Sequence, residues 1–229
     1  MLLGNGAGAF PTVNVFADRG IQGLSRVLTG FKLADVNDDD NVDLVAGLFG
    51  QRTVTAVLGD GQGGFEEKPE AAFGGVTNTL LGVLGVGNFV PDADGKSFDD
   101  LLIFADSEMQ VAIVKSVGDG TFAEGEKYAV HGSENTNQGA TAASGDFNND
   151  GFTDFVVSSV ELLPGNEVAQ HLDLFYNDQS GSFVRRTPIV LPDFAIDHLT
   201  TLDMNKDGKT DIIGTARNAV VVLLGVSGK

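Results

Sequence analysis

The sequence contains no cysteine among its 229 residues. Disulfide bonds and thiolate metal sites are therefore excluded. Its three histidines, His131, His171 and His198, lie far apart along the chain, and none has a ligand-like neighbour three or four residues away. We therefore expect the histidines to be structural or surface residues rather than zinc ligands.

Long apolar runs and basic residues are also scarce. No stretch approaches the roughly 18 uninterrupted apolar residues that a membrane-spanning helix needs, so we expect no membrane insertion. Only 14 basic residues face 32 acidic ones, and the net charge of −18 opposes binding to nucleic acid or anionic lipid. The first ten residues lack the basic start and apolar run of a signal peptide, so any export signal is expected outside this chain.

Familiar catalytic motifs are missing as well. The sequence has no G-x-S-x-G elbow, no H-E-x-x-H pair and no P-loop lysine. The segment "GNGAG" at 4–8 has the glycines of a dinucleotide loop, but "FPTVNVFA" follows it and reads as a strand rather than a helix. Two carboxylates could serve a glycosidase, yet the clearest acids here have metal-loop spacing. We expect a protein that is not an enzyme.

Two motifs recur along the whole chain. A glycine-rich turn that ends on phenylalanine occurs as "GNGAGAF" (4–10), "GDGQGGF" (59–65), "GDGTF" (118–122) and "NDQSGSF" (177–183). Acidic segments alternate with these turns and begin at 35, near 88–92, at 146 and at 203. Two interleaved motifs with a common period indicate a repeat architecture. The glycines suit tight hairpin turns, which need positive φ.

Short β-like runs fill each period. Segments such as "DLVAGL" and "TVTAVLG" are rich in β-branched residues and bounded by Gly, Asn and Asp, and no 3.6-residue apolar pattern competes with them. Four strands in about 55 residues is the pattern of a propeller blade. We predict an all-β fold: a β-propeller-type array of four-stranded blades, forming one domain over 1–229. The repeats would be 1–34 (partial), 35–87, 88–145, 146–202 and 203–229 (partial).

The acidic loops have the spacing of cation sites. Counted from the first aspartate, loops one (35–43), three (146–154) and four (203–211) carry oxygen-bearing side chains at positions 1, 3, 5 and 9. A backbone carbonyl at position 7 could add another oxygen. The candidate ligands are Asp35, Asn37, Asp39, Asn41 and Asp43; Asp146, Asn148, Asp150, Phe152 and Asp154; and Asp203, Asn205, Asp207, Lys209 and Asp211. Flexible, carboxylate-rich oxygen sets suit Ca²⁺ better than Mg²⁺ or transition metals.

These loops are not EF-hands, because position 12 is Ala46, Val157 or Gly214 inside a β-like run instead of a helical glutamate. Glycine at position 6 would allow a sharp turn, and Asp40 at that place in loop one is tolerant of positive φ. A polar turn that binds nothing is the alternative for any single loop. Repetition of the same oxygen positions in three loops favours three calcium sites.

Loop two departs from the pattern. Its sequence "GNFVPDADGKSFDDLLIF" keeps the flanks of the other loops but inserts about four residues, including a proline. Asn88, Asp92, Asp94 and Asp100 could still gather around an ion, so a fourth site stays possible with its register open.

Residues 35–65, "DVNDDDNVDLVAGLFGQRTVTAVLGDGQGGF", resemble the FG-GAP/VCBS repeat of integrin α-subunit propellers and of many bacterial and fungal surface proteins. The resemblance rests on D-x-[DN]-x-D-[G/D]-x-x-D, an apolar strand and then G-[DN]-G-x-G-x-F. It implies one propeller blade per repeat, with calcium in the turn between its first two strands. Family members are mostly extracellular adhesion or ligand-binding modules, sometimes lectins and sometimes domains attached to enzymes.

Two functional hypotheses follow. The first is a calcium-binding scaffold, secreted or at the cell surface, that binds an unidentified protein or glycan. The alternative is an accessory or catalytic domain of a secreted carbohydrate- or lipid-active enzyme. "LLG" occurs in equivalent repeat positions at 2–4 and 223–225, so we favour a segment of a longer propeller or an open array completed by another chain. Exposed strand edges would then promote self-association.

Overall fold

A computed structural model describes eleven parts of the chain, and each regular element in them is an antiparallel β-strand. The described residues are 2–3, 12–13, 28–48, 53–72, 81–92, 96–105, 110–131, 141–163, 168–191, 196–216 and 219–225. The predicted all-β fold is confirmed. No helix in these residues could span a membrane.

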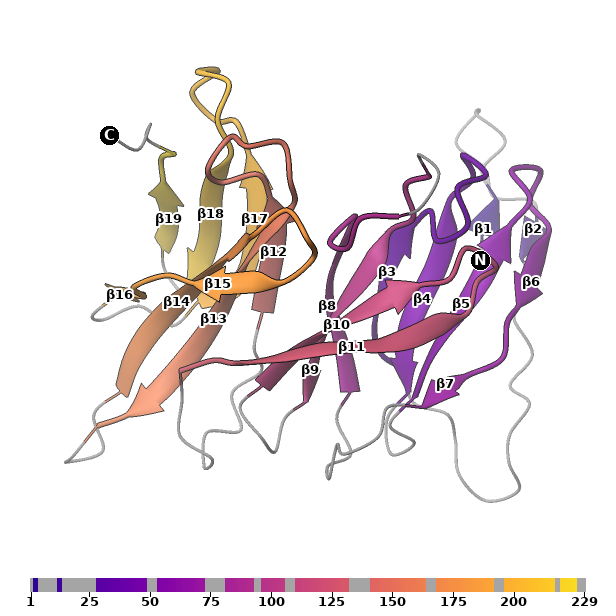
Figure 1. The fold of residues 1–229 in the computed structure, drawn as a ribbon, viewed down its shortest axis with the longest axis horizontal. Helices are drawn as coiled ribbons and strands as arrows, with labels where there is room; N and C mark the ends of the chain where they lie inside the picture. The colour runs from indigo at the N-terminus through magenta and orange to yellow at the C-terminus, as the bar shows by residue number, and fades with distance from the viewer. Residues whose placement is uncertain are drawn as a thin grey trace.

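Four sheets follow one another along the chain as four blades (Figure 1). Blade 1 contains β3 (Leu28–Ala34), β4 (Asp43–Leu48), β5 (Thr53–Gly59) and β6 (Phe65–Glu67), with β7 (Ala71–Ala72) also pairing with β5. Blade 2 contains β8 (Leu81–Gly87), β9 (Asp100–Ala105), β10 (Gln110–Ser116) and β11 (Phe122–Ala129). In both blades the first four strands pair in sequence order, as short connections favour.

The other two blades repeat this order. Blade 3 contains β12 (Thr141–Gly145), β13 (Asp154–Leu162), β14 (Val168–Asn177) and β15 (Phe183–Arg185), with β16 (Ile189–Leu191) pairing with β14. Blade 4 shows three strands in its described residues, β17 (Ile196–Leu202), β18 (Asp211–Ala216) and β19 (Ala219–Leu223). A separate pair, β1 (Leu2–Leu3) and β2 (Thr12–Val13), lies near the N-terminus.

Hydrophobic cores lie between successive blades rather than within them. Along β13, for example, Phe155 belongs to the core shared with blade 2, whereas Val156 belongs to the core shared with blade 4. Period-two alternation sends neighbouring residues to opposite faces of a sheet, so runs such as "DFVV" must be apolar on both sides. The first strand of each blade contacts the first strand of the next. Figure 1 shows blades 1 and 4 at opposite ends of the row.

The glycine-rich turns close the outer hairpins as predicted. Positive φ occurs at Gly118 (88°) and Gly120 (85°), and at the corresponding residues of the turns in blades 1 and 3. A Cβ on Gly118 would collide with the ring of Phe98, so this turn needs glycine for space as well as for conformation. Of the repeated phenylalanines, Phe183 is buried between blades 2 and 3. The first copy of the turn, with Phe10, lies outside the described residues.

Candidate functional site

Each acidic loop joins the first two strands of a blade, and loops one, three and four close around the carboxylate at position 1. The Asp146 carboxylate accepts hydrogen bonds from the N–H groups of Asp150 (3.1 Å) and Gly151 (2.8 Å). In loop four, Asp203 accepts the equivalent bonds at 3.1 and 2.9 Å. Asp35 of loop one accepts from four successive N–H groups. The three loops therefore have one backbone design.

Left-handed backbone conformations occur at two positions of each loop. Position 6 has φ of 63° at Asp40, 90° at Gly151 and 82° at Gly208, which confirms the predicted turn. Position 4 is also left-handed, at Asp38, Asn149 and Lys206. Position 4 is not among the repeated oxygen positions 1, 3, 5 and 9. Asp38 and Asn149 could have indicated a left-handed position, because Asp and Asn tolerate this conformation. Lys206 gives no such indication.

Positions 3 and 5 form an exposed pair at the rim of each loop. The amide nitrogen of Asn148 donates to Asp150 Oδ2 (3.1 Å), and Asp150 Oδ1 accepts from the N–H of Phe152 (3.0 Å). In loop one the equivalent N–H bond from Asn41 holds the pKa of Asp39 below its usual value. Asn37 Oδ1 in that loop is a buried oxygen without a hydrogen-bond partner. It is thus an unused acceptor on a side chain that is bonded to the Asp39 carboxylate.

Position 9 is fully buried in every loop and ties the loop to the blade. Asp154 accepts from the N–H of Phe147 at position 2 (2.9 Å) and from that of Asn177 at the end of β14 (2.8 Å). Asp43 and Asp211 make the same two kinds of bond. These residues are therefore structural anchors as well as candidate ligands.

The carboxylates of one loop lie close enough to repel one another. The pKa of Asp154 is raised to about 6, mainly by burial; the charges of Asp150 and Asp146 add to this rise, and its backbone hydrogen bonds oppose it. Burial likewise raises the pKa of Asp43, with Asp39 and Asp35 adding to the effect. In loops one and three, positions 1, 5 and 9 therefore share one region of negative potential.

The structure resolves the register of loop two. Asp100 accepts from the N–H groups of Phe89 (3.0 Å), Val90 (2.8 Å) and Ser116 (2.9 Å), so it is the position-9 anchor and Asn88 stands at position 1. Burial raises the pKa of Asp100 to about 6. Asp94 lies outside the described residues.

A lysine supplies positive charge inside loop two. Lys115 Nζ lies 3.2 Å from Asp92 Oδ1 and donates to the carbonyl of Pro91 (2.9 Å). The Asn88 amide nitrogen donates to Ser97 Oγ (2.8 Å). Loop two therefore neutralises part of its charge within the chain, which the other loops do to a lesser degree. In loop four, Lys209 Nζ lies 3.1 Å from the exposed Asp207.

In the described residues, no three His, Asp or Glu side chains already stand in a metal-binding arrangement. Oxygens at positions 1 and 9 accept backbone N–H groups, and position 5 accepts the Asn side chain of position 3. Each carboxylate oxygen has a second lone pair, so these bonds leave acceptor capacity toward a cation.

Blade 3 also holds a polar cluster that the sequence did not reveal. Buried Asp173 accepts from Arg185 Nε (3.0 Å) and from Ser159 Oγ (3.0 Å), and it lies 2.7 Å from His131 Nδ1. The His131 ring stacks on His171 at 4.6 Å between centroids. Ser159 and His131 both bond to the aspartate rather than to each other, so the cluster lacks the nucleophile–base contact of a catalytic triad.

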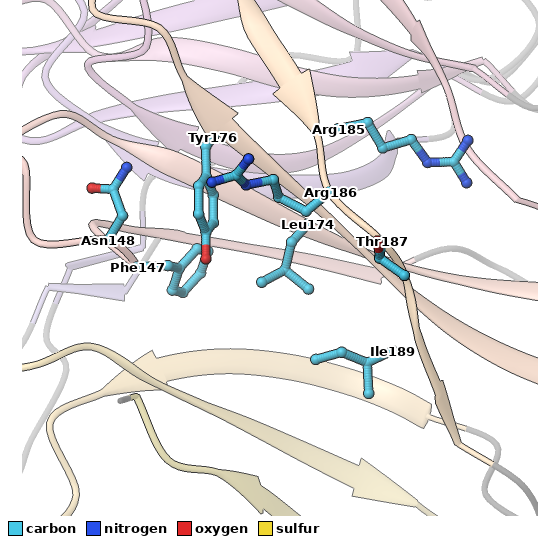
Figure 2. Close-up of a pocket in the computed structure, with 8 residues that line it drawn as sticks. All are labelled: Phe147, Asn148, Leu174, Tyr176, Arg185, Arg186, Thr187 and Ile189. Atoms are coloured by element: carbon cyan, nitrogen blue, oxygen red, sulfur yellow. The ribbon is translucent and has the colours of Figure 1, made fainter. Parts of the chain in front are cut away.

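An open groove of about 740 Å³ lies beside loop three (Figure 2). Phe147, Leu174 and Ile189 give it an apolar floor, and the Arg186 guanidinium covers the Tyr176 ring at 4.7 Å. Asn148, Arg185 and Thr187 complete the lining. In Figure 2 the Arg185 guanidinium points away from the others. The lining of the groove therefore includes a cation–aromatic pair, Arg186 with Tyr176, and Asn148, which is position 3 of loop three.

Comparison with protein families gives a match to the FG-GAP-like repeat over residues 92–157. This span runs from loop two through β9–β12 and loop three into β13, so it contains both recurring motifs. Comparison with curated proteins finds no relative at a significant level. The resemblance inferred from the motifs is thereby confirmed: residues 92–157 carry an FG-GAP-like repeat within a β-propeller-type array.

Proposed function

We propose that this protein is a calcium-stabilised extracellular scaffold whose propeller blades present a binding surface to a protein or glycan. One observation carries the proposal: loops one, three and four share one backbone design, and in loops one and three the carboxylates at positions 1 and 5 lie close enough to position 9 to raise its pKa. Such clusters repel unless a cation compensates them. Three divalent ions would also reduce the net charge of −18.

The donor set fits calcium. All candidate ligands are oxygens, and calcium takes six to eight oxygens with flexible geometry. Asn37 Oδ1 is a buried acceptor that needs a positive partner, which a cation would provide. A bound cation would also favour the ionised form of Asp154, whose pKa burial raises. Residues at positions 1, 3, 5 and 9, with the position-7 carbonyl, would hold the ion.

We assign three ions rather than four. Lys115 already places an ammonium group against Asp92 in loop two, and the Asn88 amide is bonded to Ser97. A divalent ion would have to displace this ammonium group. The possible fourth site is therefore left out of the proposal.

The groove beside loop three is the surface we assign to ligand binding. Asn148 belongs both to the proposed ion site and to the groove lining, so calcium would fix one wall of the groove. Aromatic faces and guanidinium groups are common anchors in binding sites. Millimolar extracellular calcium would fill loops of moderate affinity, and FG-GAP-like repeats are typical of extracellular proteins. An accessory role beside a secreted enzyme would use the same scaffold, whereas we assign no catalytic step to this chain.

Calcium titration by calorimetry, combined with thermal unfolding, tests the proposal. The test variant carries D39N, D150N and D207N, which remove the position-5 carboxylate from three loops. The control carries D60N, D119N and D178N, which remove three equally exposed carboxylates from the outer hairpin turns. Both variants lose the same charge.

The wild type and the turn variant should each bind three calcium ions and melt several degrees higher in calcium than in magnesium or EGTA. The loop variant should lose both effects. Equal loss of binding in the turn variant would mean that calcium only screens general acidity. No binding by the wild type would refute the calcium scaffold.

A further inference from the structure

The groove beside loop three differs in charge from the rest of the chain. Its eight lining residues include two arginines and no Asp or Glu, although acidic residues outnumber basic ones by 32 to 14 in the whole sequence. The Debye length is about 8 Å at physiological ionic strength, so distant carboxylates are largely screened from a ligand in the groove. The charge of the lining is therefore positive and suits an anionic ligand.

One of the two arginines is free to supply that charge. Arg185 donates from Nε to the buried carboxylate of Asp173 (3.0 Å), and its guanidinium points away from the groove (Figure 2). Arg186 is exposed, and its guanidinium lies over the Tyr176 ring, 4.7 Å from the centroid. Among the described residues, no carboxylate forms an ion pair with Arg186. Its positive charge is thus available to a ligand.

Stacking on Tyr176 positions this guanidinium without using its N–H groups. The contact with the ring uses the flat face of the guanidinium, whereas its five N–H donors lie in the plane and point outward from the edge. The backbone is also fixed, because the N–H of Arg186 donates to the carbonyl of Leu174 (2.8 Å), on the strand that carries Tyr176. A planar fork of donors held in this way matches a carboxylate, which it can bind through two parallel hydrogen bonds.

The remaining lining suits a sugar ring better than an extended peptide. Extended peptides bind mainly through main-chain hydrogen bonds along a strand edge. Segment 186–189 offers few free donors for this purpose, because the N–H of Arg186 is bonded within the blade and Pro188 has none. The groove instead offers an apolar floor and the exposed hydroxyl of Thr187. A pyranose ring is complementary to this surface, since it has an apolar face of C–H groups and hydroxyls at its edge.

We propose that the groove binds a glycan that contains hexuronic acid, with the sugar carboxylate on Arg186 and the ring on the apolar floor. The groove is the one assigned to ligand binding, so this proposal rests on the proposed function and names its ligand class. Asn148 connects the groove to loop three, because its amide nitrogen donates to Asp150 Oδ2 (3.1 Å). Calcium would neutralise the carboxylates of that loop and should therefore strengthen the binding of an anionic ligand beside it.

Calorimetry with matched tetrasaccharides tests the proposal. Tetramers of glucuronic acid and of galacturonic acid are titrated into the protein in millimolar calcium and physiological salt, with the glucose and galactose tetramers of the same linkage as neutral controls. Within each pair a carboxylate replaces a CH₂OH group, so the difference in affinity measures recognition of the carboxylate. At least one uronate tetramer should bind about tenfold or more tightly than its neutral partner, because a hydrogen bond to a charged group has this strength.

Three variants identify the group that binds the carboxylate. R186Q should remove the preference for the uronate, and R186K should weaken it, because lysine keeps the charge but lacks the planar fork. K96Q is the matched control: Lys96 Nζ lies over the Phe98 ring at 5.5 Å, outside the groove, so this variant also loses one exposed cation from an aromatic ring. K96Q should bind the uronate as the wild type does. Thermal unfolding checks that each variant is folded.

Separate calcium titrations distinguish this proposal from the proposed function. A protein that binds calcium but neither uronate tetramer, or that binds the neutral tetramers equally well, would overturn the uronate assignment and leave the scaffold standing. Uronate binding by a protein that binds no calcium would overturn the scaffold alone. Tighter binding of tetraglutamate than of both uronates would identify an acidic peptide as the ligand and overturn the proposal. Equal losses in R186Q and K96Q would overturn the assignment of the carboxylate to Arg186.

Discussion

At the scale of single residues, the position-9 aspartates have two roles, one in the structure of the blade and one in the proposed ion site. Asp154 is fully buried, and its two oxygens accept N–H groups from opposite sides, one from the loop and one from the end of β14. Buried carboxylates are costly unless such donors compensate them. The same residue holds the hairpin together and adds to the negative potential of the loop, so structure and proposed ion binding depend on one side chain.

This double role predicts different effects for two substitutions in loop three. D154N would turn an amide NH₂ toward a backbone N–H group and leave a buried donor unsatisfied, which should lower the free energy of unfolding by about 2–4 kcal/mol. D150N, at the exposed rim, should leave stability in EGTA within about 0.5 kcal/mol of the wild type while weakening calcium binding. Urea unfolding in EGTA measures both. Equal stability losses would contradict the division between anchor and rim.

At the scale of elements, loop two shows how one strand supplies another loop with charge. Lys115 extends from β10, and its ammonium group reaches Asp92, whose side chain is almost completely buried. The insertion that obscured the register of this loop thus comes with a compensating cation from the neighbouring strand. The sequence contains both residues, but their pairing requires β9 and β10 to be side by side.

Removing that ammonium group should destabilise blade 2. K115M would leave the Asp92 carboxylate with fewer partners and should lower the free energy of unfolding by about 1.5–3 kcal/mol, since a hydrogen bond to a charged group contributes in this range. K68M breaks the pair with the exposed Glu66 and should cost less than about 1 kcal/mol. Chemical denaturation of both variants provides the comparison. A K115M protein as stable as wild type would show that the ion pair contributes nothing to loop two.

At the scale of the whole molecule, buried carboxylates govern the response to pH. Burial raises the pKa of Asp100 and of Asp154 from 3.8 to about 6, so the folded protein binds protons more tightly than the unfolded chain does. Protonation therefore favours the folded state, and this contribution is lost as the pH rises from about 4 to above 6.

In EGTA, without calcium, the protein should accordingly melt at a lower temperature at pH 7 than at pH 5. Calcium should reduce this difference, because a cation in loop three favours the ionised form of Asp154. Thermal scans between pH 4 and 8, with EGTA and with calcium, measure both effects. A melting temperature that rises steadily with pH in EGTA would contradict the assigned pKa directions.

Much of the architecture follows from the sequence alone. Two interleaved motifs and short β-branched runs determined the all-β array, the hairpin turns and the positions of the acidic loops, because turn chemistry and period-two patterning are local properties. The same locality placed candidate ligands at positions 1, 3, 5 and 9 of each loop. The FG-GAP-like repeat was recognisable from these motifs and is matched over 92–157.

Only the tertiary structure decided what these residues contact. The burial of Asp43, Asp100, Asp154 and Asp211, the pairing of Lys115 with Asp92, and the cluster around Asp173 all join residues from different strands. The exposure of Phe31 and Val220 likewise depends on which blades pack against one another. Local sequence fixes the conformation of a loop or turn, whereas burial and partnership arise from strand register and blade packing, which bring distant segments of the chain together.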